Sequence, residues 1–468
     1  MNDLKFWSLG PGKNTFDIEA LHCFLKMNGF GTYKSDEFEG VILVKQEGRI
    51  IKIVNPKQIR KHCWKYIESE HRFNDVEERK LIKNEFQKNK SLFHKDNLEL
   101  MERIQIDEIK DDEKTSYLFF VNCILKITED GVTKLSYNDI KGHVFERDII
   151  NFELKTNNPN AYSNDGEFLQ FLRYICLDED IERKTENLNS LITIIGYLLH
   201  RYKNLSFTKA VIFMDDYNGT GPNGGTGKTL LATALAKVRS TTFEDGKYFN
   251  LKERFTLSSI SYDTRLLVID DLPKSFDLEK LFPLITGSAR VERKWENKIT
   301  LPFEVSPKII LTSNYPFTRT EESYVRRKID FVLSRYFSST RTPESVFGHL
   351  FFTEWEHQDL EDFFLLMADC ISDFLTFGIK EQEINIPERT LKMEAHPKFL
   401  EYAKTHFQTG IKYNKKEVYN EYYDQNPGVS IVELTTFRLW LKLYGDANGY
   451  KFIESHSGND NHFQYSLE

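Results

Sequence analysis

The amino-acid sequence predicts an α/β fold in the middle of the chain, with a parallel sheet flanked by helices. Ala210 to Met214 is a short apolar run of the kind that forms a buried strand. Thr229 to Val238 places its apolar side chains on one helical face. A second apolar run, Leu266 to Ile269, ends in two aspartates. Buried strands that alternate with helices in this order are typical of a parallel sheet.

The composition is that of a folded globular protein. The chain has 468 residues, of which 40% are hydrophobic and 14% aromatic, enough for two or three domain cores. Its formal net charge is −8, whereas nonspecific nucleic-acid binders concentrate lysine and arginine. A histone-like binder is therefore excluded, and any nucleic-acid contact must be local, such as a pore lining or one small module.

Cysteine spacing and hydropathy indicate a cytoplasmic protein. The five cysteines lie far apart without a CxxC pair, so neither a zinc site nor a disulfide framework is predicted. No apolar run reaches 18 residues, and the first residues lack the basic and apolar segments of a secretion signal. We expect a reducing compartment and no membrane partner.

Changes in the sequence pattern predict five segments. They are a mixed α+β N-terminal domain over 1–155, a helical collar over 156–205, the α/β core over 206–340, a helical extension over 341–386 and a small module of helix, helix and hairpin over 387–468.

A glycine-rich loop lies between the first buried strand and its helix, and it ends in Gly227, Lys228 and Thr229. Backbone N–H groups of such a loop can surround phosphate oxygens at a helix N-terminus, whose dipole favours anions. Lys228 would then reach the β and γ phosphates of ATP, and Thr229 would ligate Mg²⁺. The usual GxxxxGK spacing would require glycine where Pro222 stands, and a glycine-rich surface turn is the alternative. The predicted ATP-binding residues are Gly224, Gly225, Thr226, Gly227, Lys228 and Thr229.

The aspartates that follow the second strand supply the carboxylates that an ATPase needs. Asp270 is the better candidate for the metal side, and Asp271 for orienting the attacking water. Acidic residues that merely cap a buried strand are the alternative. The position of the pair, about 40 residues after the loop, favours the catalytic interpretation.

Two further polar positions follow a third strand, Ile309 to Leu311. Asn314 can hydrogen-bond the γ phosphate or the lytic water, although an Asx turn would also suit Asn-Tyr-Pro. Arg326 and Arg327 follow, and in a ring one of them can stabilise transition-state charge at the neighbouring subunit's nucleotide. A pair of solvated arginines is the alternative, and the sequence does not decide which of the two acts.

The order of phosphate-binding loop, LLVIDD, basic hairpin segment, IILTSN and RR resembles the superfamily III helicases of the AAA+ class. The similar branch includes the poxvirus primase-helicase and primase-helicases of phages, plasmids and integrated elements. YLFFVNCILKITEDGVTKL upstream and TPESVFGHLFFTEWEHQDL downstream extend the resemblance over most of the chain. It implies a ring-forming, usually hexameric replicative DNA helicase in a bacterial host cell, with ATP and Mg²⁺ as cofactors. Single-stranded or fork DNA and a separate primase or polymerase would be its partners.

The resemblance also implies a DNA-gripping hairpin, which maps onto residues 286 to 305. Its tip holds Lys294, Trp295 and Lys298. A cation beside an aromatic ring suits single-stranded DNA, because phosphate pairs with lysine while a base stacks on the ring. The family often has histidine where Trp295 stands, and an ordinary hairpin with a buried tryptophan is the alternative.

The last module resembles a winged helix. Helices are predicted over Lys415 to Tyr423 and Leu434 to Leu443, and a terminal hairpin turns at HSGND. Such modules place the second helix in a DNA groove or contact protein.

Two other functions compete with the helicase interpretation. A primase would need clustered carboxylates, but Asp111, Asp112 and Asp178 to Asp180 sit in highly charged stretches that predict solvated surface. A remodelling or switch ATPase of the AAA+ class would act on protein instead of DNA. Stimulation of ATP turnover by single-stranded DNA separates this last possibility from a helicase.

Overall fold

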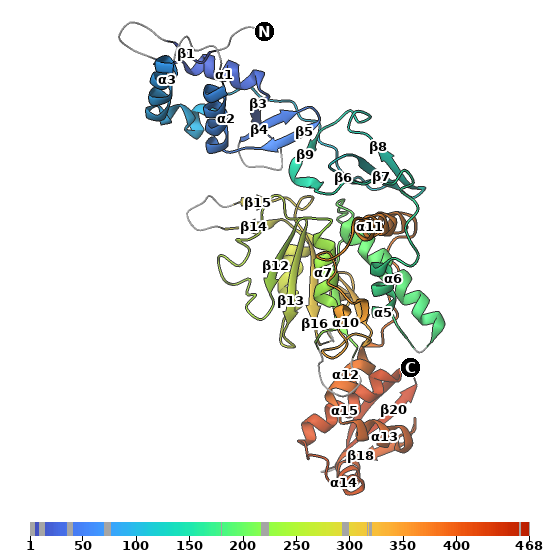
Figure 1. Cartoon of the computed structure of the whole chain (residues 1–468). Coiled ribbons are helices and arrows are strands. Elements are labelled where there is room, and N and C mark those ends of the chain that lie inside the picture. Colours follow the sequence, from blue (N-terminus) through green and yellow to red (C-terminus); the bar gives the residue numbers. More distant parts are fainter. Residues whose placement is uncertain are drawn as a thin grey trace.

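The structure is a computed structural model. It describes residues 5–8, 15–34, 41–69, 76–178, 180–216, 224–292, 299–315, 317, 321–457 and 460–467. Figure 1 shows an N-terminal region, a central α/β core and a C-terminal module that follow one another from the N-terminus to the C-terminus.

The N-terminal region builds a first sheet with helices packed beside it. The sheet has the order β3-β4-β5-β9, and apolar side chains such as Leu21, Ile59 and Phe86 join its helices in one core. The elements are β1 (Trp7–Ser8), β2 (Thr15–Phe16), α1 (Ile18–Met27), β3 (Phe30–Tyr33), β4 (Ile42–Glu47), β5 (Ile50–Ile53), α2 (Pro56–Ser69), α3 (Val76–Lys88), α4 (Lys95–Leu98) and β9 (Val144–Phe145).

A second sheet of the N-terminal region belongs to a different core. Leu118, Phe120 and Leu125 pack with the helices of the central region, so the residues expected as one domain over 1–155 contribute to separate hydrophobic cores. The sheet has the order β10-β6-β7-β8. Its strands are β6 (Ser116–Phe120), β7 (Ile124–Thr128), β8 (Gly131–Leu135) and β10 (Ile149–Ile150).

The central region contains the parallel sheet that the sequence predicts. Its five strands lie in the order β12-β13-β16-β11-β17, and every neighbouring pair is parallel. Because parallel strands end at the same edge, polar residues that follow different strands meet there. The strands are β11 (Ala210–Asp215), β12 (Thr241–Asp245), β13 (Leu266–Leu272), β16 (Lys308–Ser313) and β17 (Lys328–Leu333).

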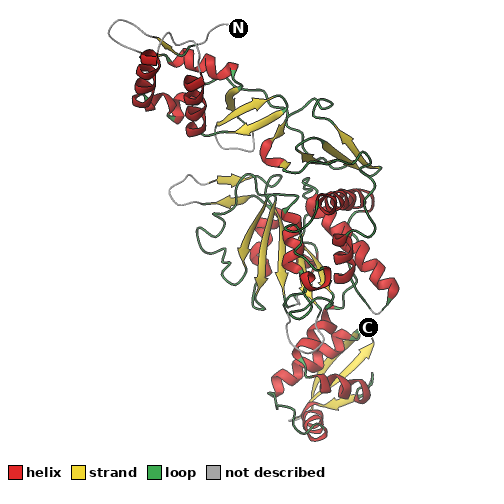
Figure 2. Cartoon of the chain, in the orientation of Figure 1, coloured by secondary structure: helices red, strands yellow, loops and turns green. Residues whose placement is uncertain are grey.

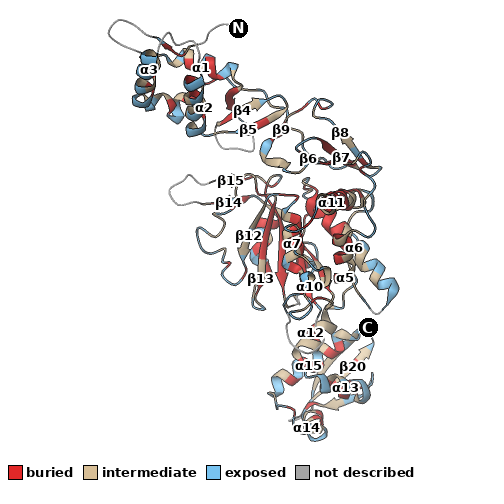
Figure 3. Cartoon of the chain, viewed as in Figure 1, coloured by how far each residue is buried: buried red, intermediate tan, exposed pale blue. Residues whose placement is uncertain are grey.

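Both faces of this sheet are covered, as the unbroken apolar run of β11 requires. Val211 and Phe213 face the core formed with α5, α6, α7 and α11, whereas Ile212 and Met214 face the core formed with α8 and the β14–β15 hairpin. Figure 2 shows the strands of this sheet with helices beside them, and Figure 3 shows most of the sheet as buried, whereas the edge strand β12 is more exposed. The covering elements are α5 (Glu167–Ile175), α6 (Ile181–Leu199), α7 (Lys228–Ala236), α8 (Phe282–Thr286), β14 (Ala289–Val291), β15 (Ile299–Leu301), α9 (Glu322–Val325), α10 (Pro343–Phe347) and α11 (His357–Phe377).

The C-terminal module is a small helical domain with a three-stranded antiparallel sheet in the order β18-β20-β19. Phe399, Tyr422, Phe437 and Trp440 form its aromatic core. Its resemblance to a winged helix stays a prediction. The elements are α12 (Ile386–Glu394), α13 (Pro397–His406), β18 (Lys412–Asn414), α14 (Lys415–Gln425), α15 (Leu434–Ala447), β19 (Tyr450–Ser457) and β20 (Asp460–Leu467).

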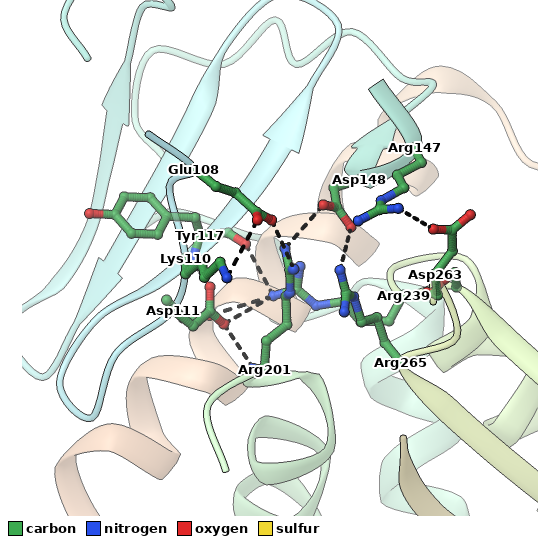
Figure 4. A network of polar contacts seen from close by, with 12 residues as sticks. Glu108, Lys110, Asp111, Tyr117, Arg147, Asp148, Arg201, Arg239, Asp263 and Arg265 are labelled. Atoms are coloured by element: carbon green, nitrogen blue, oxygen red, sulfur yellow. Dashed lines mark hydrogen bonds and ion pairs between the residues drawn. The ribbon is translucent and has the colours of Figure 1, made fainter. Parts of the chain in front are cut away.

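Buried ion pairs join the N-terminal region to the core (Figure 4). The Asp111 side chain is 1% exposed, so the prediction that it lies on solvated surface was wrong. Its carboxylate accepts hydrogen bonds from the Ser116 hydroxyl at 2.6 Å and from the backbone N–H groups of Tyr117 and Arg201. It also pairs with the Arg239 guanidinium at 3.5 Å. One residue of this charged stretch, Asp111, is therefore a buried contact that anchors the N-terminal region to the core.

A second anchor lies beside the first. Asp148 lies between Arg201, at 3.3 Å, and Arg265, at 3.6 Å, and Arg147 pairs with Asp263 at 2.5 Å. Burial acts to raise the pKa of the Asp148 carboxyl, but the surrounding arginines outweigh burial and lower that pKa to about 2. The carboxylate therefore stays ionised inside the interface.

Replacing Asp111 with alanine is expected to lower the free energy of unfolding by about 3–5 kcal/mol, because Arg239 would be left buried without its counter-charge. The neighbouring exposed residue supplies the control, since Asp112→Ala should change stability by less than about 0.5 kcal/mol. Chemical unfolding of the full chain measures both values. Equal stabilities of the two variants would show that the anchor does not hold the regions together.

Candidate active site at the carboxyl edge of the sheet

The phosphate-binding loop is described from Gly224 onward, where it enters α7. Gly225 and Gly227 have positive φ angles of 91° and 105°, which favour glycine. A Cβ atom on Gly227 would also lie 2.9 Å from the ring of Phe171. Glycine is therefore the residue that fits both positions without strain, and it leaves the backbone of the loop uncovered by side chains. Lys228 is the first residue of the helix, at the positive end of its dipole.

Lys228 lies at the centre of the site. Its side chain is buried, and its Nζ forms an ion pair with Asp215, the last residue of β11. The same nitrogen donates to the Asn314 Oδ1 atom at 3.0 Å, and the Thr226 hydroxyl donates to Asp215. Asp215 thus holds the place of an anion beside the lysine. A ligand phosphate at this nitrogen would have to take over the contact.

Asp270 lies next to the hydroxyl of Thr229. The Thr229 Oγ1 atom is 3.2 Å from Asp270 Oδ2, and the Thr312 hydroxyl donates to Asp270 Oδ1 at 2.5 Å. Hydroxyl and carboxylate oxygens are the ligands that Mg²⁺ prefers, and proteins usually supply only one or two of them to a nucleotide-bound ion. Thr229 and Asp270 therefore fit the metal role predicted for them.

Asp271 is held in a strained position beside Asp270. Its φ is +58°, rare for a residue other than glycine, and the β13–β16 pairing shifts register between Ile269 and Leu272. Asn314 Nδ2 donates to Asp271 Oδ1 at 3.2 Å, and Lys247 Nζ pairs with Oδ2 at 2.7 Å. This geometry turns the carboxylate of Asp271 toward Asn314, and so toward the lysine that Asn314 also contacts.

The structure thus brings together Lys228, Thr229, Asp270, Asp271 and Asn314, whose roles in ATP hydrolysis stay predictions. Sequence reasoning missed three neighbours. Asp215 had a signal, because an apolar strand that ends in aspartates was the pattern used for Asp270. Thr312 and Lys247 had none, because their contacts depend on the order of the strands.

A cavity of about 430 Å³ opens beside the loop. It extends from the start of α7 to the segment around α10, which the sequence assigned to the helical extension. Its lining includes Gly225, Lys228, Thr229, Pro343, His349 and Phe351. The site therefore has room for a ligand larger than a phosphate group.

Arg326 and Arg327 lie at the opposite edge of the sheet. They directly precede β17, whose six residues run parallel to β11. At about 3.3 Å per residue, the two edges are about 20 Å apart. Arg327 donates to the Ser323 carbonyl at 2.9 Å and packs 4.7 Å from the Phe282 ring centroid, whereas Arg326 is exposed. Neither arginine reaches the loop of its own chain.

Several predicted residues lie outside the described part of the chain. They are Pro222 of the loop and the hairpin-tip residues Lys294, Trp295 and Lys298. The strands β14 and β15 on both sides of the tip form the antiparallel pair expected of a hairpin.

A parallel sheet with a glycine-containing loop at the end of one strand and a helix after it defines an α/β core of the nucleotide-binding type. The helices described in the structure include none with the length and hydropathy needed to cross a membrane.

Comparisons with known proteins add the following findings. Residues 220–327 match the family of unknown function DUF5906. No curated protein matches the chain. An apo structure of the NrS-1 C-terminal region is similar, with 13% identity, a TM-score of 0.36 and coverage of 96% of this chain and 99% of that one. The ORC2 protein of Aeropyrum pernix, in ADPNP–ADP complexes, has 13% identity, a TM-score of 0.25 and coverage of 63% and 93%.

Proposed function

We propose that this chain hydrolyses ATP with Mg²⁺ and acts as a ring-forming replicative DNA helicase of a phage, plasmid or integrated mobile element, in the cytoplasm of the bacterial host. The observation that carries the ATPase part is the convergence of a buried lysine, a hydroxyl, two carboxylates and an amide at one sheet edge. These are the group types that phosphoryl transfer requires.

Each residue has a role that follows from its contacts. Lys228 exchanges its carboxylate partner for the β and γ phosphates, and Thr229 with Asp270 would hold Mg²⁺. The ion, when bound, would neutralise charge on those phosphates. Asp271 orients the attacking water, and Asn314 links this carboxylate to Lys228. The geometry therefore couples the group that activates water to the group that binds phosphate.

The position of the arginines supports a ring. A site that stabilises transition-state charge uses a cation beyond the loop lysine, and an arginine finger can come from a neighbouring subunit. Arg326 is exposed about 20 Å from its own loop, so it is available to another chain. We assign the finger role to Arg326 and a structural role to Arg327. A closed homo-oligomer, a hexamer by resemblance, gives every site one finger.

DNA as the partner rests on the sequence resemblance and on the hairpin between β14 and β15. Lys294, Trp295 and Lys298 would contact single-stranded or fork DNA at its tip. The C-terminal module would act as a winged helix, and a separate primase or polymerase would work with the ring. A primase activity of the same chain stays the alternative to this reading.

Single-stranded DNA is expected to stimulate ATP turnover, and Lys294→Ala combined with Trp295→Ala should remove the stimulation but leave basal turnover intact, because neither residue has a role in the proposed hydrolysis of ATP. Lys114→Ala, at an exposed N-terminal position, removes one charge as a control. Steady-state ATPase assays with and without oligonucleotide measure the effect. If the ATPase rate of the wild type is the same with and without DNA, the result would favour a remodelling ATPase that acts on protein.

A further inference from the structure

Helix α2 of the N-terminal region is strongly basic, although the chain is acidic. It carries Lys57, Arg60, Lys61 and Lys65 against one carboxylate, Glu68, while the whole chain has a net charge of −8. A local basic element of this kind is what an acidic protein needs if it contacts a polyanion. The sequence pattern alone did not single out this helix, because a charged helix is usually a solvated one.

The basic side chains of α2 share a groove with aromatic rings. The groove has a volume of about 360 Å³. Among the described residues, its lining contains cations, aromatic rings and an amide but no carboxylate, and it consists of Lys57, Arg60, Lys61, Trp64, Phe86 and Gln87. Such a lining attracts an anion that also carries flat apolar surface.

The floor of the groove is fixed by packing. Phe86 of α3 is buried, and the Arg60 guanidinium lies 5.6 Å from its ring centroid. Lys83 Nζ lies 5.2 Å from the Trp64 ring centroid and pairs with Glu68 at 3.1 Å. The tryptophan is therefore held between α2 and α3. An aromatic ring held in place loses little conformational entropy when a ligand stacks on it.

Two exposed lysines lie on the same face of α2 as the Trp64 ring. Lys57, Lys61 and Trp64 follow one another at about one helical turn on the same face of α2, so neighbouring side chains are about 5–6 Å apart at their Cβ atoms. Lys57 and Lys61 are exposed, and within the described residues neither has a carboxylate partner. Both ammonium groups can therefore be reached by phosphates from the solvent.

We propose that the α2 groove binds single-stranded nucleic acid, with Lys57, Arg60 and Lys61 contacting backbone phosphates and Trp64 stacking on a base. Cations beside an aromatic platform are the composition of sequence-tolerant single-strand sites. An acidic peptide would use the cations but would leave the rings unused. This site deepens the DNA-partner part of the proposed function, because it adds a contact in the N-terminal region, outside the ATPase core.

The test measures binding of a fluorescent oligothymidylate to the full chain, without nucleotide, over a range of salt concentrations. The plot of log K against log salt has a negative slope, and each phosphate contact in a single strand contributes about 0.7 to its magnitude. Lys57→Gln with Lys61→Gln should therefore make the slope less steep by about 1.4. Trp64→Leu should weaken binding about tenfold, within the range for stacking on one base. The matched control, Lys80→Gln with Lys90→Gln, removes the same charge from exposed positions outside the groove and should leave the slope unchanged.

An unchanged slope in the groove variant, or an equal change in the control, overturns the site. Competition by polyglutamate as effective as that of the oligonucleotide would assign the groove to acidic peptides instead. If Trp64→Leu unfolds, cross-linking of the wild type to an iodouracil oligonucleotide tests the site instead. Adducts are expected on α2, and adducts found only elsewhere would overturn the proposed groove. Basal ATPase, measured in parallel, separates the two proposals. A wild type that hydrolyses ATP but binds no oligonucleotide would contradict both the nucleic-acid site and the helicase function. The proposed ATPase activity would not be affected by that result.

Discussion

Replacing Lys228 with alanine is expected to abolish ATP hydrolysis and to weaken nucleotide binding, because the β and γ phosphates lose their main cationic partner. The side chain is buried where α7 begins and already bonds to Asn314 and an anionic carboxylate. Turnover assays and binding of a fluorescent ATP analogue measure the two effects. Full activity in Lys228→Ala would rule out the phosphate-binding role of the loop.

Two companion variants make this result specific. Lys228→Ala leaves Asp215 buried without its cation, so Lys228→Ala with Asp215→Asn should recover stability without recovering turnover. Asp271→Asn should bind ATP normally but lose turnover, because Thr229 and Asp270 remain for the metal. An equal loss of ATP binding in Asp271→Asn would show that the roles of the two aspartates are reversed.

Replacing Arg326 with alanine is expected to lower turnover by about 10³-fold or more while nucleotide binding persists. The reason is that transition-state charge at one site loses the cation supplied by its neighbour. Arg327→Ala is the matched control, because its guanidinium packs on Phe282 and donates to the Ser323 carbonyl of its own chain. It should affect stability more than the chemical step. The opposite pattern would exchange the roles of the two arginines.

Mixed rings give the sharper measurement. Lys228→Ala chains still carry Arg326, and Arg326→Ala chains still carry an intact loop. Mixing the two inactive variants should therefore restore part of the ATPase activity. Mixtures that assemble but stay inactive, or a wild type that is equally active as a dilute monomer, would show that no finger acts between subunits.

The ends of the buried strands were predictable from the sequence, and so were most of the polar side chains that the structure gathers there. Runs such as Ala210 to Met214 are apolar without alternation, which marks strands covered on both faces, and the polar residues that follow them are easy to recognise. The structure extends this strand by one residue, Asp215, and begins the helix at Lys228. The local sequence pattern was therefore enough to predict the edge of the sheet at which these polar residues lie.

Contacts that depend on tertiary pairing could not be predicted in this way. The burial of Asp111 arises because Arg239, 128 residues later, ends beside it, and nothing local distinguishes Asp111 from its exposed neighbour Asp112. Lys247 reaches Asp271 only because β12 lies next to β13. Strand order decides such contacts, and periodicity carries no information about strand order.

Two elements of the core have a proposed active-site residue at one end and an anchoring arginine at the other. Lys228 begins α7 and Arg239 follows its end, while Arg265 precedes β13 and Asp270 lies near its end. Helices and paired strands keep a nearly fixed rise per residue, so they move lengthwise as stiff rods. A displacement at the phosphate edge would therefore act across the core as a mechanical load on the N-terminal region.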